Sequence, residues 1–428
     1  MPNIEINISN KKEININEDL IQIAQQPDQQ LEQRLEQQPE QQPEQPKIVM
    51  ADILDMDHPH TVHKLYHISD THINLFLRHQ EYSEVFERLY QELRKENRKD
   101  NCLIVLTGDI LHSKTELSPE CIHLTTQFFA QLSSIMNLII IAGNHDANLN
   151  NNTRMDSLTP IVDGLENKER VYYLRNTGVY RFNNILFSVA SIFDYNVIPA
   201  FQVPDIEGCL KIALFHGRVN GALLYNGIRL SGEINHRLGK TITPSTFKGY
   251  DYVLMGDIHK HQFLDKKKRI AYAGSLIQQN HGESYGNHGF LIWNLRTRST
   301  SFINVHNNYG YYTLKVIDNK YPEILFDVNN DDGNDDNEIN EEDVVIKSGI
   351  LPKNVRLRIE SVRSTTSFIK RLYSLIETEY NIVGKLINEL SNEDDSSRNI
   401  HNISLNVADP EYQNQLIEEY LQSVNATD

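Results

Sequence analysis

The chain has 428 residues, which is more than one small core needs and enough for two or three domains. Its hydrophobic share of 39% is low for a wholly globular chain, so part of it is expected to lie outside any core. There is no apolar run of 18 residues and no basic-then-apolar leader, so we expect neither a membrane span nor a secretory signal. Three widely spaced cysteines exclude a disulfide framework and indicate a reducing compartment.

The net charge of −17 is unevenly distributed along the chain. Residues 1–60, 327–343 and 392–428 carry net charges of −8, −9 and −7, so the remainder carries +7. The predicted folded body is therefore mildly basic although the whole chain is acidic. Such a body is compatible with a ligand that has a phosphate backbone.

Residues 1–60 are predicted to form a disordered tail. Within them, residues 25–47 consist almost wholly of Gln, Pro and Glu. This composition cannot bury enough apolar surface to offset the entropy of ordering the chain.

The main domain is predicted over residues 61–310, where short apolar runs alternate with amphipathic segments. The runs, each typical of a buried strand, are 65–68, 103–106, 138–141, 212–215 and 252–255. Apolar residues recur at helical spacing over residues 82–93, and Ser118 with Pro119 is a typical helix start. This alternation predicts an α/β domain.

A small α+β domain is predicted over residues 311–391, with an acidic linker at 327–343 inside it. Residues 392–428 are predicted to be a polar linker that ends in a helix at 412–424. That helix is a candidate docking segment for a partner, and simple packing on its own domain is the alternative.

Each apolar run of the main domain is followed at once by side chains that can bind a metal ion. These side chains are Asp70 and His72; Asp109 and His112; Asn144, His145 and Asp146; His216; and Asp257, His259 and His261. Because ligands bind beyond the carboxyl ends of strands in open α/β sheets, we expect the loops to converge on one site. Oxygen and imidazole ligands suit manganese, iron, magnesium or zinc.

Taken singly, these motifs are weak signals. Asp-x-His or His-Gly alone is more typical of a surface loop, and Gly-Asn-His-Asp alone can be a turn. All of them in order, each behind an apolar run, are hard to explain as turns. The sequence therefore favours a metal site, and two ions about 3.5–4 Å apart could activate water and clamp the oxygens of a displacement.

The motif order resembles that of the calcineurin-like metallophosphoesterases. Within that superfamily, residues 108–112, 154–158 and 273–278 resemble the SbcD-type nucleases, also called the meiotic-recombination-eleven family. The resemblance covers residues 64–300, and residues 311–391 more loosely as a capping domain. It implies a four-layer α-β-β-α metallophosphoesterase sandwich with a small α+β capping domain.

The resemblance also implies the metal ligands. The first ion would be held by Asp70, His72, Asp109 and His259, and the second by Asp109, Asn144, His216 and Asp257. Asp109 would bridge the two ions. The family usually has Gly-His-x-His where this chain has Asp257 two residues before His259; Asp is a competent ligand. We expect Asp257 to bind the second ion, with His261 as the alternative.

Further residues would act on the substrate. His145 resembles the family's catalytic histidine, which protonates or stabilises the leaving 3′-oxygen, and Asp146 would orient its ring. His112 resembles a second active-site histidine that helps to place the substrate phosphate. Arg154 and Lys114 lie near the motif loops and are the expected phosphate contacts.

The resemblance implies a DNA exonuclease and endonuclease for double-strand-break repair or DNA end processing. It implies two divalent ions, manganese first and iron, magnesium or zinc as alternatives, together with a homodimer and a separate SbcC-type coiled-coil ATPase. A small-molecule or other phosphodiesterase of the superfamily and a non-catalytic scaffold on this fold remain alternatives. We expect a soluble intracellular protein, in cytoplasm, nucleus or a viral replication site.

Overall fold

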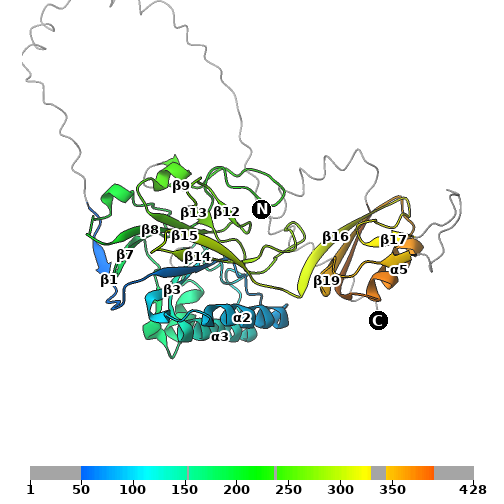
Figure 1. The fold of residues 1–428 in the computed structure, drawn as a ribbon, viewed down its shortest axis with the longest axis horizontal. Coiled ribbons are helices and arrows are strands. Elements are labelled where there is room, and N and C mark those ends of the chain that lie inside the picture. Colours follow the sequence, from blue (N-terminus) through cyan, green and yellow to red (C-terminus); the bar gives the residue numbers. More distant parts are fainter. Residues whose placement is uncertain (1–49, 152–153, 236–238, 329–343, 390–428) are drawn as a thin grey trace, which may run out of the picture. The chain divides into compact units, whose positions relative to one another are not determined.

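The computed structural model describes residues 50–151, 154–235, 239–328 and 344–389 (Figure 1). Most of the predicted tail and the predicted helix at 412–424 therefore lie outside the described residues. Residues 53–55 differ from the prediction, because they form a strand rather than the end of a tail. This strand, β1 (Ile53–Asp55), runs parallel to β6 (Gly178–Phe182) and pairs with it.

One sheet of the described residues carries the loops after the first three apolar runs. Its strands, in spatial order, are β15 (Ser299–Asn304), β14 (Gly289–Asn294), β2 (Lys64–Ile68), β3 (Cys102–Thr107), β4 (Asn137–Ile141) and β5 (Val171–Tyr173). Strands β2 to β5 are parallel, so their carboxyl ends meet at one edge. Every residue of β3 is buried, as its continuous apolar run predicts.

Three helices cover the outer face of this sheet: α2 (His79–Arg94), α3 (Pro119–Ile135) and α4 (Leu158–Asp163). In Figure 1, α2 and α3 lie side by side along the sheet. The predicted stripe on α2 is buried, including Tyr82, Phe86 and Leu89. The hydroxyl of Ser118 accepts the backbone N–H of Cys121, so α3 begins where the sequence predicts.

A second sheet of the described residues carries the loops after the last two apolar runs. Its strands, in spatial order, are β1, β6, β7 (Ile185–Ala190), β8 (Leu210–His216), β11 (Tyr252–Gly256), β13 (Ile270–Tyr272) and β12 (Gln262–Phe263). A buried apolar cluster that includes Val105, Phe187 and Trp293 fills the space between the two sheets.

The far face of the second sheet is covered by segments with short elements. These are the 3₁₀ helices η3 (Ala200–Gln202) and η4 (Pro244–Phe247) and the strands β9 (Ile234–Asn235) and β10 (Lys240–Thr241). Val203 and Phe247 pack against Met255 of the sheet. The predicted α/β fold class is confirmed, and its fourth layer is built, across the described residues, from loops and 3₁₀ turns in place of α-helices.

Residues 309–389 have their own apolar core in the part described. A parallel sheet is formed by β16 (Tyr309–Ile317), β19 (Asn354–Val362) and β20 (Asn381–Glu389). It packs against α5 (Thr366–Glu377) and the antiparallel pair of β17 (Phe326–Val328) and β18 (Val344–Ile346). The beginning of the predicted acidic linker belongs to β17, and residues 329–343 lie outside the described ranges. No helix among the described residues is long and apolar enough to cross a bilayer.

Candidate metal centre

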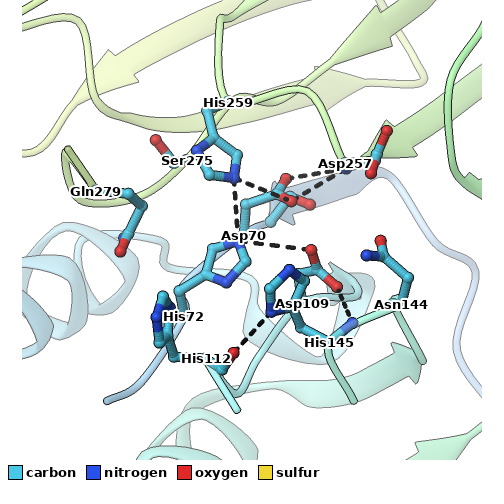
Figure 2. A network of polar contacts seen from close by, with 12 residues as sticks. Asp70, His72, Asp109, His112, Asn144, His145, Asp257, His259, Ser275 and Gln279 are labelled. Carbon is cyan, nitrogen blue, oxygen red and sulfur yellow. Dashed lines mark hydrogen bonds and ion pairs between the residues drawn. The ribbon is translucent and has the colours of Figure 1, made fainter. Parts of the chain in front are cut away.

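The predicted ligands converge at the carboxyl ends of β2, β3 and β4 in one sheet and of β8 and β11 in the other (Figure 2). Asp70, His72, Asp109 and Asp257 all have positive φ angles, of 50°, 46°, 52° and 96°. Non-glycine residues adopt this conformation rarely, and such strain gathers at functional sites. Gly108 must also be glycine, because a Cβ there would lie 2.6 Å from the backbone nitrogen of Gly143.

Asp109 lies between two groups of ligands. Its Oδ2 is 3.5 Å from Nε2 of His72, and its Oδ1 is 3.3 Å from Nε2 of His216. Figure 2 shows His72 and His259 on one side of Asp109 and Asn144 and Asp257 on the other. This is the placement that a bridging ligand requires.

The first group consists of Asp70, His72 and His259, whose ligand atoms all lie within 4.8 Å of one another. Nε2 of His72 is 3.0 Å from Nε2 of His259, and the latter is 4.0 Å from Oδ1 of Asp70. Two ring nitrogens that face each other beside a buried carboxylate are suited to a shared cation.

The second group surrounds His216. The ring Nδ1 of this residue lies 2.7 Å from the backbone oxygen of Thr107, which accepts its hydrogen and directs Nε2 into the site. Nε2 is 3.1 Å from Oδ1 of Asn144 and 3.9 Å from Oδ1 of Asp257. An imidazole nitrogen facing several oxygens is the donor set that a divalent ion would satisfy.

The pKa shifts in the metal-free centre also indicate a site for cations. Burial raises the pKa of Asp70, and burial raises the pKa of Asp257 to about 7. Burial opposes ionisation of His216, but the neighbouring Asp109 carboxylate raises the pKa of this histidine well above its usual value. Buried carboxylates this close together need compensating positive charge. The residues present therefore fit two divalent metal ions.

The structure separates the two alternatives for the last ligand of the second group. The backbone nitrogen of Asp257 donates to Oδ1 of Asp70 over 3.0 Å, which holds its loop inside the centre. The ring of His261 instead stacks on Phe302 at 4.5 Å, and its Nδ1 lies 3.0 Å from the backbone oxygen of Tyr272. Asp257 is brought to the site, whereas His261 is directed elsewhere.

The predicted role of Asp146 is wrong. Its Oδ1 accepts the backbone N–H groups of Ile110 and Leu111 at 3.0 Å, and its Oδ2 accepts that of Gly143 at 2.8 Å. The carboxylate is fully buried and joins the loops after β3 and β4. Because backbone donors occupy both oxygens, Asp146 supports the loops and does not orient the ring of His145.

The backbone of His112 orients His145 instead. Nδ1 of His145 lies 2.6 Å from the carbonyl oxygen of His112, and the His145 backbone N–H donates to Oδ1 of Asp109 over 2.8 Å. The His145 ring meets the ring of His72 edge-on, with centroids 4.8 Å apart. His112 itself is exposed to solvent.

Lys114 and Arg154 are exposed on the loops after β3 and β4. These loops are joined, because the hydroxyl of Ser157 donates to the backbone oxygen of Lys114 over 3.1 Å. Among the described residues, neither charged side chain forms a hydrogen bond or ion pair.

Glu283 also belongs to the centre, although its position in the sequence does not predict this. Its Oε1 lies 2.7 Å from Nδ1 of His259. It stands 24 residues after that histidine, in a polar stretch with no ligand-like spacing. No signal in the sequence distinguishes it from an exposed loop glutamate.

Comparison with known proteins agrees with this geometry. Residues 63–290 match the calcineurin-like phosphoesterase family. The chain is 44% identical over 261 residues to "Uncharacterized protein R555" of Acanthamoeba polyphaga mimivirus, which covers 59% of the chain and 19% of that protein. It is 24% identical over 210 residues to "Putative phosphoesterase 244L" of Invertebrate iridescent virus 6, which covers 49% of the chain and 70% of that protein.

The chain thus spans about a fifth of the length of the mimivirus relative and most of the iridescent virus relative. The family match covers the segment from just before β2 to the first residues of β14, which contains every predicted metal ligand. With the metal-ligand groups described above, the chain belongs to the calcineurin-like phosphoesterase family, whose members are metal-dependent phosphoester hydrolases.

Proposed function

We propose that the chain is a two-metal deoxyribonuclease, with manganese as its ion, that acts on DNA ends in double-strand-break repair or end processing. The observation that carries the proposal is the histidine pair beside the metal centre. His145 lies against the bridging Asp109, and the carbonyl of His112 holds its ring. The motif resemblance of residues 108–112, 154–158 and 273–278 to SbcD-type nucleases supports DNA as the substrate.

Two divalent ions would be held on either side of Asp109, one by Asp70, His72 and His259 and the other by Asn144, His216 and Asp257. They would supply an activated water and neutralise charge on the phosphodiester. The protein's own contribution is to fix the ligands. Asp146 ties the loop that carries Asp109 to the loop that carries Asn144, so the two groups keep a constant relation. The bond from His216 to Thr107 keeps that imidazole directed at Asp109.

His145 is proposed to act on the leaving oxygen. Its Nδ1–H donates to the His112 carbonyl, and this bond persists whether the ring is neutral or protonated, because a carbonyl accepts in both cases. Protonation therefore adds a hydrogen at Nε2 without reorienting the ring. An Nε2–H so held can donate to the 3′-oxygen as the phosphodiester bond breaks.

Substrate binding is proposed to use the exposed cations at the rim. Lys114 and Arg154 stand on the two loops that also carry His112 and His145, so a phosphate they contact lies near the reacting one. The mildly basic body would add attraction at longer range. A second copy of the chain and an SbcC-type ATPase are the proposed partners, on the motif resemblance alone.

The test is degradation of linear double-stranded DNA by the full chain in manganese, with EDTA as the metal control. His145→Ala should lower the rate by about 10²–10⁴-fold, the range for loss of a general acid. His123→Ala is the matched control, since His123 is exposed on α3. Manganese-dependent cleavage of bis-nitrophenyl phosphate without DNA cleavage would instead favour the small-molecule phosphodiesterase, and absence of both with no bound metal would favour the scaffold.

A further inference from the structure

The three histidine ligands differ in what contacts their outer ring nitrogen. Nδ1 of His72 has no hydrogen-bond partner among the described residues, Nδ1 of His216 meets a backbone carbonyl, and Nδ1 of His259 meets the carboxylate of Glu283. A carboxylate on the outer nitrogen fixes the tautomer and ring orientation and makes the inner nitrogen a stronger ligand. His259 is therefore the histidine whose ligand quality depends most on a neighbouring side chain.

The side chain of Glu283 is buried, and hydrogen bonds fix both of its carboxylate oxygens. Its side chain is only 5% exposed. Beside His259, its Oε1 accepts the side-chain amide of Asn280 at 3.2 Å, and its Oε2 accepts the backbone N–H of Gln279 at 2.9 Å and the hydroxyl of Ser275 at 3.5 Å. A buried carboxylate supplied with several donors is fixed in place and stays ionised.

The contacts of Glu283 continue to the second domain through Gln278. The side-chain nitrogen of Gln278 donates to the backbone oxygen of Glu283 at 2.9 Å and to that of Tyr311 at 3.1 Å. Its side-chain oxygen accepts the backbone N–H of Tyr311 at 2.8 Å. Gln278 is 2% exposed, and Tyr311 belongs to β16. The buried side-chain amide of Gln278 therefore forms two hydrogen bonds with the backbone of Tyr311, as a neighbouring strand would.

A second buried side chain supports the same segment. Nη2 of Arg78 donates to the backbone oxygen of Gln278 at 2.7 Å, and the guanidinium lies 5.2 Å from the ring centre of Tyr311. Arg78 also pairs with Glu81, which accepts a salt bridge from Arg356 of β19 at 2.8 Å. Strands β16 and β19 are therefore tied to the segment that contains Glu283 by buried polar contacts.

We propose that Glu283 is a positioning residue for the metal ligand His259, and that Gln278 links it to strand β16, so that the second domain sets the affinity of the first metal position. The proposal rests on the two-metal centre of the proposed function but not on DNA as the substrate. It predicts that changes at Glu283 or Gln278 weaken metal binding at the first position and leave the second unchanged.

The test compares manganese binding by the full chain with Glu283→Gln, Glu283→Leu and Gln278→Leu, using titration calorimetry and the metal content after dialysis at fixed free manganese. Glu283→Leu removes the acceptor, and we expect one of two manganese sites to weaken by about 10–100-fold, as found for such outer contacts. Glu283→Gln keeps an uncharged acceptor and should lose less. Gln278→Leu should weaken the same site by less than Glu283→Leu.

Glu96→Gln is the matched control, because Glu96 is a partly buried acid paired with Lys64 at the opposite end of β2. Melting in EDTA separates positioning from stability: a merely structural Glu283 would lower the metal-free melting temperature and leave both affinities intact, which overturns the proposal. Equal weakening of both sites also overturns it. If the wild-type chain binds no manganese, the two-metal function itself fails, whereas two tight sites in every variant would refute this inference alone.

Discussion

The two metal positions are built from similar ligands but are supported differently. At the first, the carboxylate of Glu283 lies behind His259; at the second, the neutral carbonyl of Thr107 lies behind His216, at the same distance of 2.7 Å. A charged acceptor makes an imidazole a stronger ligand than a neutral one does. The first position is therefore expected to hold its ion more tightly than the second.

Exposure does not separate the two positions. Asp70 is fully buried and His259 is 23% exposed in the first group, while His216 is fully buried and Asp257 is 21% exposed in the second. The difference between the positions therefore lies in the acceptor behind each histidine. Contacts behind the ligands are therefore expected to give the two ions unequal affinities.

The largest effect is expected from Asp109→Asn, because this residue is the ligand that both positions share. Losing one charged oxygen of the bridge should remove both ions at micromolar manganese. Hydrolysis should fall by at least about a thousandfold, on the order of 4 kcal/mol of transition-state stabilisation. Metal content and hydrolysis of a generic phosphodiester measure this, and a variant that keeps two ions would show that Asp109 does not bridge.

Asp257→Ala should weaken metal binding only at the second position, since one carboxylate ligand is lost while the first group is untouched. The loss should exceed the range of about 10–100-fold that applies to removal of an outer contact. Calorimetric titration with manganese should show one site unchanged and one weakened. His261→Ala serves as the matched variant, because its ring stacks on Phe302 outside the centre. Weaker binding in His261→Ala with full binding in Asp257→Ala would reverse the assignment.

Metal removal should make stability depend on alkaline pH. In the metal-free centre burial opposes protonation of His259, but the carboxylate of Glu283 raises its pKa from 6.5 to about 9. A raised histidine pKa stabilises the fold below pH 6.5, and this stabilisation is lost as pH rises from about 6.5 through 9. The melting temperature in EDTA should fall by a few degrees over this window.

With manganese bound, the same rise in pH should leave the melting temperature almost unchanged, because the metal holds the imidazole in its neutral form. Glu283→Gln should make the decline in EDTA less steep and leave the part due to His216, whose pKa the Asp109 carboxylate also raises. If the melting temperature fell equally steeply with and without manganese, the titrating group would lie outside the metal centre.

The smallest effect is expected from the exposed side chains of Lys114 and Arg154. Lys114→Ala and Arg154→Ala should each weaken DNA binding several-fold and reduce the dependence of log affinity on log salt by about 0.9, the value for one duplex phosphate contact. Both ions should remain bound. Filter binding at several salt concentrations would detect this, and an unchanged slope would remove these side chains from the DNA contact.

Much of the centre could be predicted from the sequence because its ligands follow strands directly. Asp70 comes two residues after β2 and Asp109 two after β3, so the parallel register alone brings them together. The buried face of α2 and the N-cap of α3 at Ser118 could also be predicted from the sequence, because each depends on residues within a few turns of one helix.

What could not be predicted depends on contacts distant in sequence. Glu283 meets His259 only because the chain returns through the segment after β13. The predicted role of Asp146 came from the family resemblance, yet its partners Ile110 and Leu111 come from another loop. Strand β1 is only three residues long, and it forms by pairing with β6, which lies far away in the sequence.

The most direct test of the two-metal centre is a crystal structure of the full chain grown with manganese, with anomalous diffraction used to locate the ions. We predict two anomalous peaks on either side of Asp109, one beside Asp70, His72 and His259 and the other beside Asn144, His216 and Asp257. The peak next to Glu283 and His259 should have the higher occupancy at limiting manganese. A single peak, peaks away from these side chains, or higher occupancy beside His216 would contradict the account.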